Sequence, residues 1–132
     1  MYFVYRDFPL VDIHPGALLA AHVANCAAGQ DGFWPMHDRL FEGAAARAWG
    51  SGGAEDFKTF LGYAAELGLD VGKLRQCLDS NQQAPRIAAD YREGAERGVR
   101  STPTFLINGQ PFVGAHPYAD WQRYLDKLLA QR

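Results

Sequence analysis

The stretch RSTPTFLINGQPFVGA, residues 100–115, constrains the fold of this 132-residue chain most strongly. Two runs of β-forming residues, TFLI and PFVGA, flank Asn108-Gly109, a dipeptide that favours the two-residue turn of a β-hairpin. Pro103 stands directly before the first run. Proline donates no backbone hydrogen bond, so it can open a strand but rarely lies inside one. The residues alone predict an antiparallel hairpin entered through Pro103, with a trans peptide bond before it because few X–Pro bonds in folded proteins are cis.

The rest of the chain is predicted to be mostly helical. Tyr2–Phe8 is aromatic and β-branched and predicts a short strand, and apolar residues then recur at helical spacing. A strand, a helical block, a hairpin and a last helix together predict an α/β fold. The expected helices, with their inward residues where the pattern gives them, are 14–29 (Leu19, Val23, Cys26), 31–43, 54–67 (Phe57, Phe60, Leu61, Ala64), a helix capped by Asp70 (Leu74, Cys77, Leu78), 84–97 (Ile87, Tyr91) and one from Pro117 (Trp121, Tyr124, Leu125, Leu128, Leu129).

Composition excludes several classes of protein. Hydrophobic residues make up 48% of the chain and charged residues 21%, which suits one packed domain. The formal charge is −2 and no basic stripe is present, so nucleic acid is not an expected partner. No apolar run reaches the ~18 residues of a membrane span. Arg6 and Asp7 interrupt the apolar start of the chain, so it does not have the pattern of a signal peptide, and the residues specify no compartment.

The two cysteines, Cys26 and Cys77, lie on apolar helix stripes and form no CxxC motif. They are compatible with buried thiols that pack as small hydrophobes, with a structural disulfide, or with a redox pair. His22 and Cys26, four residues apart, could lie on one helix face as metal ligands. Two ligands do not make a zinc site, and no third is nearby, so neither a metal nor a cofactor is predicted.

Other candidate side chains have simple structural explanations. His14, His37 and His116 fall in loops or at helix starts, where caps or surface positions are expected rather than catalysts. Four residues of the second predicted helix could line a substrate groove, but core packing is the preferred interpretation for them: Trp34, Met36, Leu40 and Phe41.

Three segments resemble DsbA-type thioredoxin-fold proteins that carry a helical insertion. They are FVYRDFPL…HPGALLAAHVANCAA…GFWPMHDRLFE, YAAELGLDVGKLRQCLDS and GVRSTPTFLINGQPFVGAHPYADW, and they cover nearly the whole chain in the family's order. The resemblance implies an incomplete, DsbA-like thioredoxin fold in a single domain, residues 1–132. Within it, residues 1–11 and 85–132 form the thioredoxin-like part and residues 12–84 form the helical insertion.

The resemblance also implies a function. The family exchanges disulfides with cysteine-containing proteins and peptides, usually outside the cytoplasm. Pro103 then follows a cis bond and faces the redox site, beside Ser101 and Thr102, and the backbone of Thr102 pairs with a substrate peptide as an extra strand. Relatives with cysteines at similar places favour a structural disulfide between Cys26 and Cys77.

The family's nucleophile is missing from the sequence. It belongs to a CxxC at the start of a first helix, where the helix N-terminus lowers the thiol pKa, and neither Cys26 nor Cys77 matches those positions. The resemblance therefore implies part of a thiol–disulfide oxidoreductase, truncated before the second strand and inactive by itself. The alternative is a non-catalytic remnant that binds peptides or self-associates. A dimer is expected to cover the missing strand, and its rival is a monomer whose Tyr2–Phe8 strand pairs with the hairpin.

Overall fold

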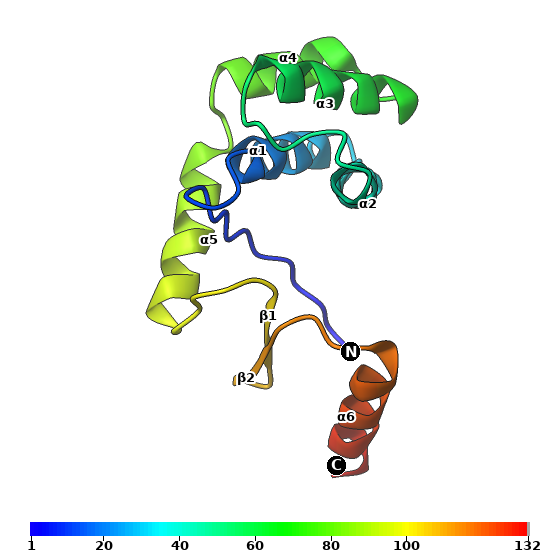
Figure 1. Cartoon of the computed structure of the whole chain (residues 1–132), viewed down its shortest axis with the longest axis vertical. Coiled ribbons are helices and arrows are strands. Elements are labelled where there is room, and N and C mark those ends of the chain that lie inside the picture. The colour runs from blue at the N-terminus through cyan, green and yellow to red at the C-terminus, as the bar shows by residue number, and fades with distance from the viewer. Residues whose placement is uncertain (132) are drawn as a thin grey trace. The chain divides into compact units, whose positions relative to one another are not determined.

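A computed structural model, which describes residues 1–131, contains six α-helices and one two-stranded sheet (Figure 1). The chain divides into two compact units, Met1–Arg97 and Gly98–Arg132. None of the helices in residues 1–131 is long and apolar enough to cross a membrane. The elements are α1 (Ala17–Ala28), α2 (Phe33–Ala45), α3 (Ala54–Glu66), α4 (Val71–Asp79), α5 (Ala84–Glu96), β1 (Thr104–Ile107), β2 (Gln110–Val113) and α6 (Tyr118–Ala130).

The first unit is a helical bundle built around α1. This helix contacts α2, α3, α4 and α5, and the apolar stripes that the sequence indicates meet at its surface. Phe60, Met36 and Leu74 are fully buried there, and Asp70 caps α4 by accepting a hydrogen bond from the Lys73 amide at 3.0 Å. The hydrophobic core comprises Val23, Ala24, Cys26, Ala27, Met36, Leu40, Phe60, Tyr63, Ala64, Leu74 and Leu78.

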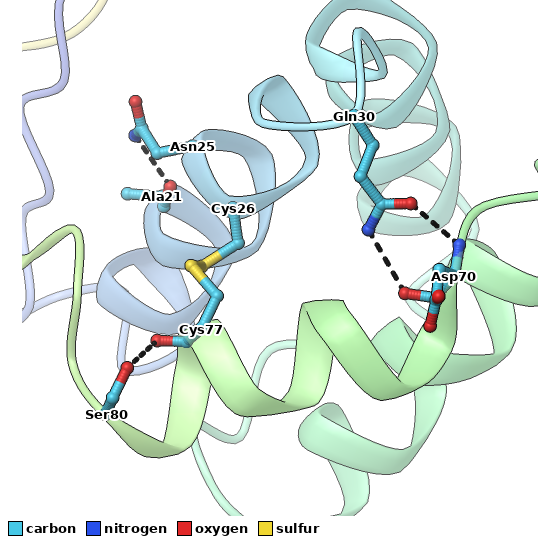
Figure 2. Close-up of a disulfide and its surroundings, with 7 residues drawn as sticks. All are labelled: Ala21, Asn25, Cys26, Gln30, Asp70, Cys77 and Ser80. Carbon is cyan, nitrogen blue, oxygen red and sulfur yellow. Dashed lines mark hydrogen bonds between the residues drawn. A yellow bond between two sulfur atoms is a disulfide. The ribbon is translucent and has the colours of Figure 1, made fainter.

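A disulfide joins α1 to α4 (Figure 2). Cys26 and Cys77 lie on the inward stripes of the two helices, with their Cα atoms 5.9 Å apart, so the predicted disulfide is confirmed. Hydrogen bonds from the Gln30 side chain link the ends of the same two helices at a second point. Its side-chain oxygen accepts from the Asp70 amide at 2.7 Å, and its Nε2 donates to the Asp70 carbonyl at 3.1 Å.

The predicted strand Tyr2–Phe8 is wrong, because the segment has no regular secondary structure. A strand exists only through hydrogen bonds to a neighbouring strand, and this segment makes side-chain contacts instead. The Asp7 amide donates to the Asp90 carboxylate at 3.1 Å, and the Phe8 ring stacks on Tyr91 at 4.4 Å. Tyr91, predicted to face inward, is therefore 42% exposed, since it covers Phe8 rather than entering the core.

The second unit is the predicted hairpin followed by α6. Asn108 (φ 50°) and Gly109 (φ 82°) both adopt the left-handed conformation that a type I′ turn requires. The paired residues Phe105 and Phe112 both pack against Trp121, with ring centroids 4.4 and 4.7 Å apart. The inward face of α6 is shorter than predicted: Leu129, in its last turn, is 60% exposed.

Candidate functional site

The loop Ser101–Thr102–Pro103 lies exposed immediately before β1. The peptide bond between Thr102 and Pro103 is cis. The Thr104 hydroxyl donates to the Ser101 carbonyl at 2.7 Å, and the Gly114 amide donates to the Pro103 carbonyl at 2.8 Å. The loop is thus fixed on both sides of Thr102. Within residues 1–131 Thr102 itself makes no hydrogen bond outside the regular elements, so its polar groups are available to a ligand.

A buried polar cluster lies in the first unit, where the N-terminal segment meets α1 and α5. Asn25 donates to the Asp7 carboxylate at 2.7 Å, and Asp90 accepts from the Asp7 amide. All three residues are at least nine-tenths buried. Burial is the main cause that raises the pKa of Asp7; the neighbouring Asp90 carboxylate also raises it, whereas the Asn25 hydrogen bond and Arg86 lower it. Sequence reasoning missed this cluster, because its members are separated by up to 83 residues and have no shared pattern.

A third buried carboxylate, Asp56, organises the glycine-rich loop before α3. Its oxygens accept from the Gly50 amide at 3.0 and 3.1 Å and from the Gly52 amide at 2.7 Å. Burial by itself raises the pKa of Asp56, but these amide hydrogen bonds lower it, and the net shift is downward. Gly52 has a positive φ, and a Cβ there would clash with the Pro15 carbonyl oxygen. The carboxylate and the glycines therefore specify one loop conformation.

The second helix presents two different faces. Met36 and Leu40 are buried in the core, as preferred from the sequence, whereas Trp34 is 46% and Phe41 is 62% exposed. Core packing is therefore the right interpretation for only two of the four residues. The exposed rings surround His37, whose ring lies 5.2 Å from Trp34 and 4.8 Å from Phe41. Residues three and four apart share a helix face, so this aromatic surface follows from the helical spacing.

Two of the other histidines, His22 and His116, have structural surroundings. His22 is buried, and burial lowers its pKa. It cannot share a metal with Cys26, because the Cys26 sulfur is bonded to Cys77. His116 stacks on Phe112 at 4.2 Å, with its Nε2 2.7 Å from the Val113 carbonyl oxygen. It borders a shallow depression of about 300 Å³ lined by Phe112, His116, Asp120, Arg123, Tyr124 and Lys127.

Comparison with known proteins identifies the family. The thioredoxin family model matches residues 1–127, so the chain belongs to the thioredoxin family. Membership supports an α/β thioredoxin-like fold and the thiol–disulfide oxidoreductase-like class. No solved structure matches the chain.

Several similar curated proteins carry the name of an ion transporter. The chain is 37% identical over 116 residues to the Na(+)/H(+) antiporter NhaA 1 of Salinispora arenicola and 36% identical over 118 residues to NhaA 3 of Salinispora tropica. It is 34% identical over 114 residues to NhaA of Herminiimonas arsenicoxydans. These matches cover 86%, 88% and 86% of the chain, but only 16%, 16% and 17% of the relatives. The chain therefore spans about a sixth of the length of these relatives.

The chain has no free thiol for exchange chemistry. It contains two cysteines in all, and both take part in the Cys26–Cys77 disulfide. Cys26 is also 5% exposed, within the core. The Ser101–Thr102–Pro103 loop contains no thiol nucleophile. It has an exposed backbone that is anchored by hydrogen bonds, and such a backbone can bind an extended peptide.

Proposed function

We propose that the chain is the substrate-binding part of a DsbA-like thiol–disulfide oxidoreductase. In this proposal the Ser101–Thr102–Pro103 loop holds an extended peptide that contains a cysteine, and the CxxC nucleophile comes from outside these 132 residues. The observation that carries the proposal is the loop itself, which is exposed and anchored on both sides of Thr102. Backbone pairing supplies affinity for extended peptides with little dependence on their sequence.

The chemistry of exchange defines what is missing. A thiolate attacks one sulfur of a disulfide, forms a mixed disulfide and releases the other sulfur as a thiolate. A second thiol of the enzyme then attacks this mixed disulfide and releases the substrate. The two enzyme cysteines are left joined in a disulfide. Cys26 and Cys77 cannot take the first role while they are bonded to each other. The chain alone is therefore expected to bind substrates without turning them over.

A second candidate function is non-catalytic peptide binding. The observation that favours it is that both cysteines are used in one disulfide between helices. Ion transport, which the names of the relatives state, does not enter either proposal, because the chain spans only about a sixth of those proteins.

Binding is tested first. A fluorescent, extended peptide with its single cysteine alkylated is titrated with the oxidised chain, and anisotropy is recorded. Saturable binding is expected, and Pro103→Ala should weaken it about tenfold, or about 1.4 kcal/mol, because alanine does not fix φ as proline does and leaves the loop less ordered before it binds. Pro85→Ala, at an exposed position in the first turn of α5, is the matched control and should bind like the wild type. Absence of saturable binding contradicts both candidate functions.

Activity then separates the two candidates. Reduction of insulin by dithiothreitol should proceed at the background rate with the chain alone. Fusion to a strand–helix segment bearing CxxC should raise the rate, and Pro103→Ala in the fusion should lower it again. A fusion that binds peptide but remains at the background rate supports the non-catalytic candidate. Turnover by the unfused chain would overturn the assignment of Cys26 and Cys77 as structural.

A further inference from the structure

We propose that Pro111 and His116 together close the outer edge of β2, so that no strand, including β2 of a second copy of this chain, pairs with the hairpin from that side. The inference does not depend on the proposed function, because it rests on contacts within the unit Gly98–Arg132. An exposed strand edge is a site where other chains add, and side chains that block it prevent this association.

The register of the hairpin shows which backbone groups of β2 face outward. The Gly114 amide donates to the Pro103 carbonyl at 2.8 Å, so these two residues form a hydrogen-bonded pair. Hydrogen-bonded and non-hydrogen-bonded pairs alternate along an antiparallel ladder. Val113 and Pro111, one and three positions before Gly114, are therefore in non-hydrogen-bonded pairs. The nitrogens and carbonyls of both residues point away from β1, toward the outer edge.

Pro111 removes one of the two outward donors of β2. Its nitrogen carries no hydrogen, so the Val113 amide is the single donor that Gln110–Val113 presents on the outer edge. Proline is tolerated at this position because an outward nitrogen takes no part in the ladder to β1. A strand that approached this edge would find one donor in place of two.

His116 occupies one of the two outward acceptors. Its Nε2 lies 2.7 Å from the Val113 carbonyl oxygen. Because a carbonyl oxygen only accepts, the imidazole donates from Nε2. The ring also lies in the outward direction of this carbonyl, where the amide of an added strand would have to lie. The imidazole therefore satisfies the acceptor and fills the approach to it.

The imidazole of His116 is held in this position by its neighbours. It stacks on the Phe112 ring at 4.2 Å, and Phe112 in turn stacks on Tyr124 of α6 at 4.9 Å. Pro117 follows directly and restricts the backbone of the residue before it to extended conformations. The blocking side chain is thus ordered before any other strand arrives.

Pro111 and His116 block the same hydrogen bonds. A two-fold antiparallel pairing of β2 with β2 of a second copy would place residue 111 of each copy opposite Val113 of the other. Four hydrogen bonds would join the two strands, and two of them would run from the residue 111 nitrogen to the Val113 carbonyl. Pro111 removes the donor of these two bonds and His116 takes their acceptor. Replacing either residue alone therefore restores neither bond.

A double-mutant cycle tests this coupling. Self-association of the wild type, Pro111→Val, His116→Ala and the double variant is measured by sedimentation velocity at micromolar concentrations. The double variant should self-associate about tenfold more tightly than the other three, because it alone regains the two bonds. The matched control is Pro111→Val combined with Tyr118→Ala, which removes an 80% exposed ring at the start of α6 and should behave like the wild type.

Hydrogen exchange tests the edge without requiring a variant to fold. In the wild type the outward Val113 amide should exchange like an unprotected amide at every protein concentration. The Phe112 amide, which faces β1 in a hydrogen-bonded pair, should exchange more slowly. In the double variant, protection of the Val113 amide should rise with concentration. Circular dichroism establishes that each variant is folded.

Three outcomes overturn the proposal. The first is protection of the Val113 amide that rises with concentration in the wild type, because a strand then adds to the edge despite both residues. The second is a single variant that associates as tightly as the double variant, because the two residues then do not block the same bonds. The third is a folded double variant that associates no more tightly than the wild type, because Pro111 and His116 are then not what closes the edge.

Discussion

At the scale of single residues, two buried carboxylates of the first unit have pKa values shifted in opposite directions. Asp56 accepts hydrogen bonds from the amides of the glycine loop, whereas Asp7 lies beside Asp90 and its main favourable contact is Asn25. Hydrogen bonds to a carboxylate favour its charged form, and burial near a second carboxylate disfavours it. The pKa of Asp56 is lowered and the pKa of Asp7 is raised for these reasons.

Asp56→Asn is expected to destabilise the protein at neutral pH by about 2 kcal/mol, because an amide replaces a charged acceptor of backbone hydrogen bonds. The folded-state pKa lies below the ordinary value of 3.8, so the carboxylate stabilises the fold above that pH and loses this effect as the pH falls through the lower value. Denaturant titrations should therefore show a large difference at pH 7 that shrinks in acid. The exposed Asp12→Asn is the control, and an equal loss in both variants contradicts the prediction.

Asp7→Asn is expected to stabilise the protein at neutral pH, by an amount on the order of 1 kcal/mol. Asparagine keeps an oxygen for the Asn25 amide and removes a buried charge next to Asp90. Since the folded-state pKa of Asp7 is raised, stability is lost as the pH rises from 3.8 through the raised value. The variant should melt higher than the wild type at pH 7 and at the same temperature in acid. A lower melting temperature at pH 7 shows instead that the Asp7 carboxylate is a net stabilising group.

At the scale of elements, the contact between α1 and α4 is fixed twice, by the disulfide and by the Gln30–Asp70 hydrogen bonds (Figure 2). The disulfide closes a loop with a sequence separation of 51 residues. A cross-link of this span limits the unfolded chain more than a short one does. The hydrogen bonds instead act only in the folded state, where they hold the start of α4 against the end of α1.

Replacing both cysteines by alanine is expected to cost up to about 4 kcal/mol by the chain-entropy relation. Alanine suits the site because Cys26 lies in the apolar core. Thermal unfolding followed by circular dichroism provides the measurement. Dithiothreitol should lower the melting temperature of the wild type toward that of the double variant and leave the double variant unchanged. Equal melting temperatures for the oxidised wild type and the double variant would show that the bond contributes nothing to stability.

At the scale of the whole molecule, the buried core belongs to one unit. Every buried hydrophobic side chain of residues 1–131 lies between Val23 and Ile87, and the disulfide lies in the same region. The unit Gly98–Arg132 combines a two-stranded sheet with one helix, and none of its described residues is buried. A unit this short, with no buried side chain in its described part, is marginally stable by itself.

A polypeptide of residues 1–97 is therefore expected to fold alone, with its disulfide formed and a cooperative thermal transition. Residues 98–132 as a peptide should show no cooperative transition. Circular dichroism melting of the two pieces and a thiol titration of the first provide the measurements. A non-cooperative residue 1–97 piece would mean that its core needs the rest of the chain.

The amino-acid sequence by itself determined the local elements. Asn108-Gly109 specified the hairpin, because few dipeptides tolerate two left-handed residues. Asp70 specified the start of α4, and apolar periodicity located every helix except α2, for which the pattern gave no inward residues. The sequence also contains no CxxC motif. Membership of the thioredoxin family therefore does not by itself imply catalysis by these residues.

Only the tertiary structure decided which distant groups meet. Tyr2–Phe8 has strand-forming residues but no strand, because a strand depends on a neighbour rather than on its own composition. The Asp7–Asn25–Asp90 cluster joins three segments that share no pattern, and its pKa shift depends on burial. From the sequence alone, Cys26 and Cys77 were compatible both with free thiols and with a disulfide. The packing of α1 against α4 brings their sulfur atoms into bonding distance. Local preferences are set by neighbours in the chain, whereas burial and pairing are set by neighbours in space.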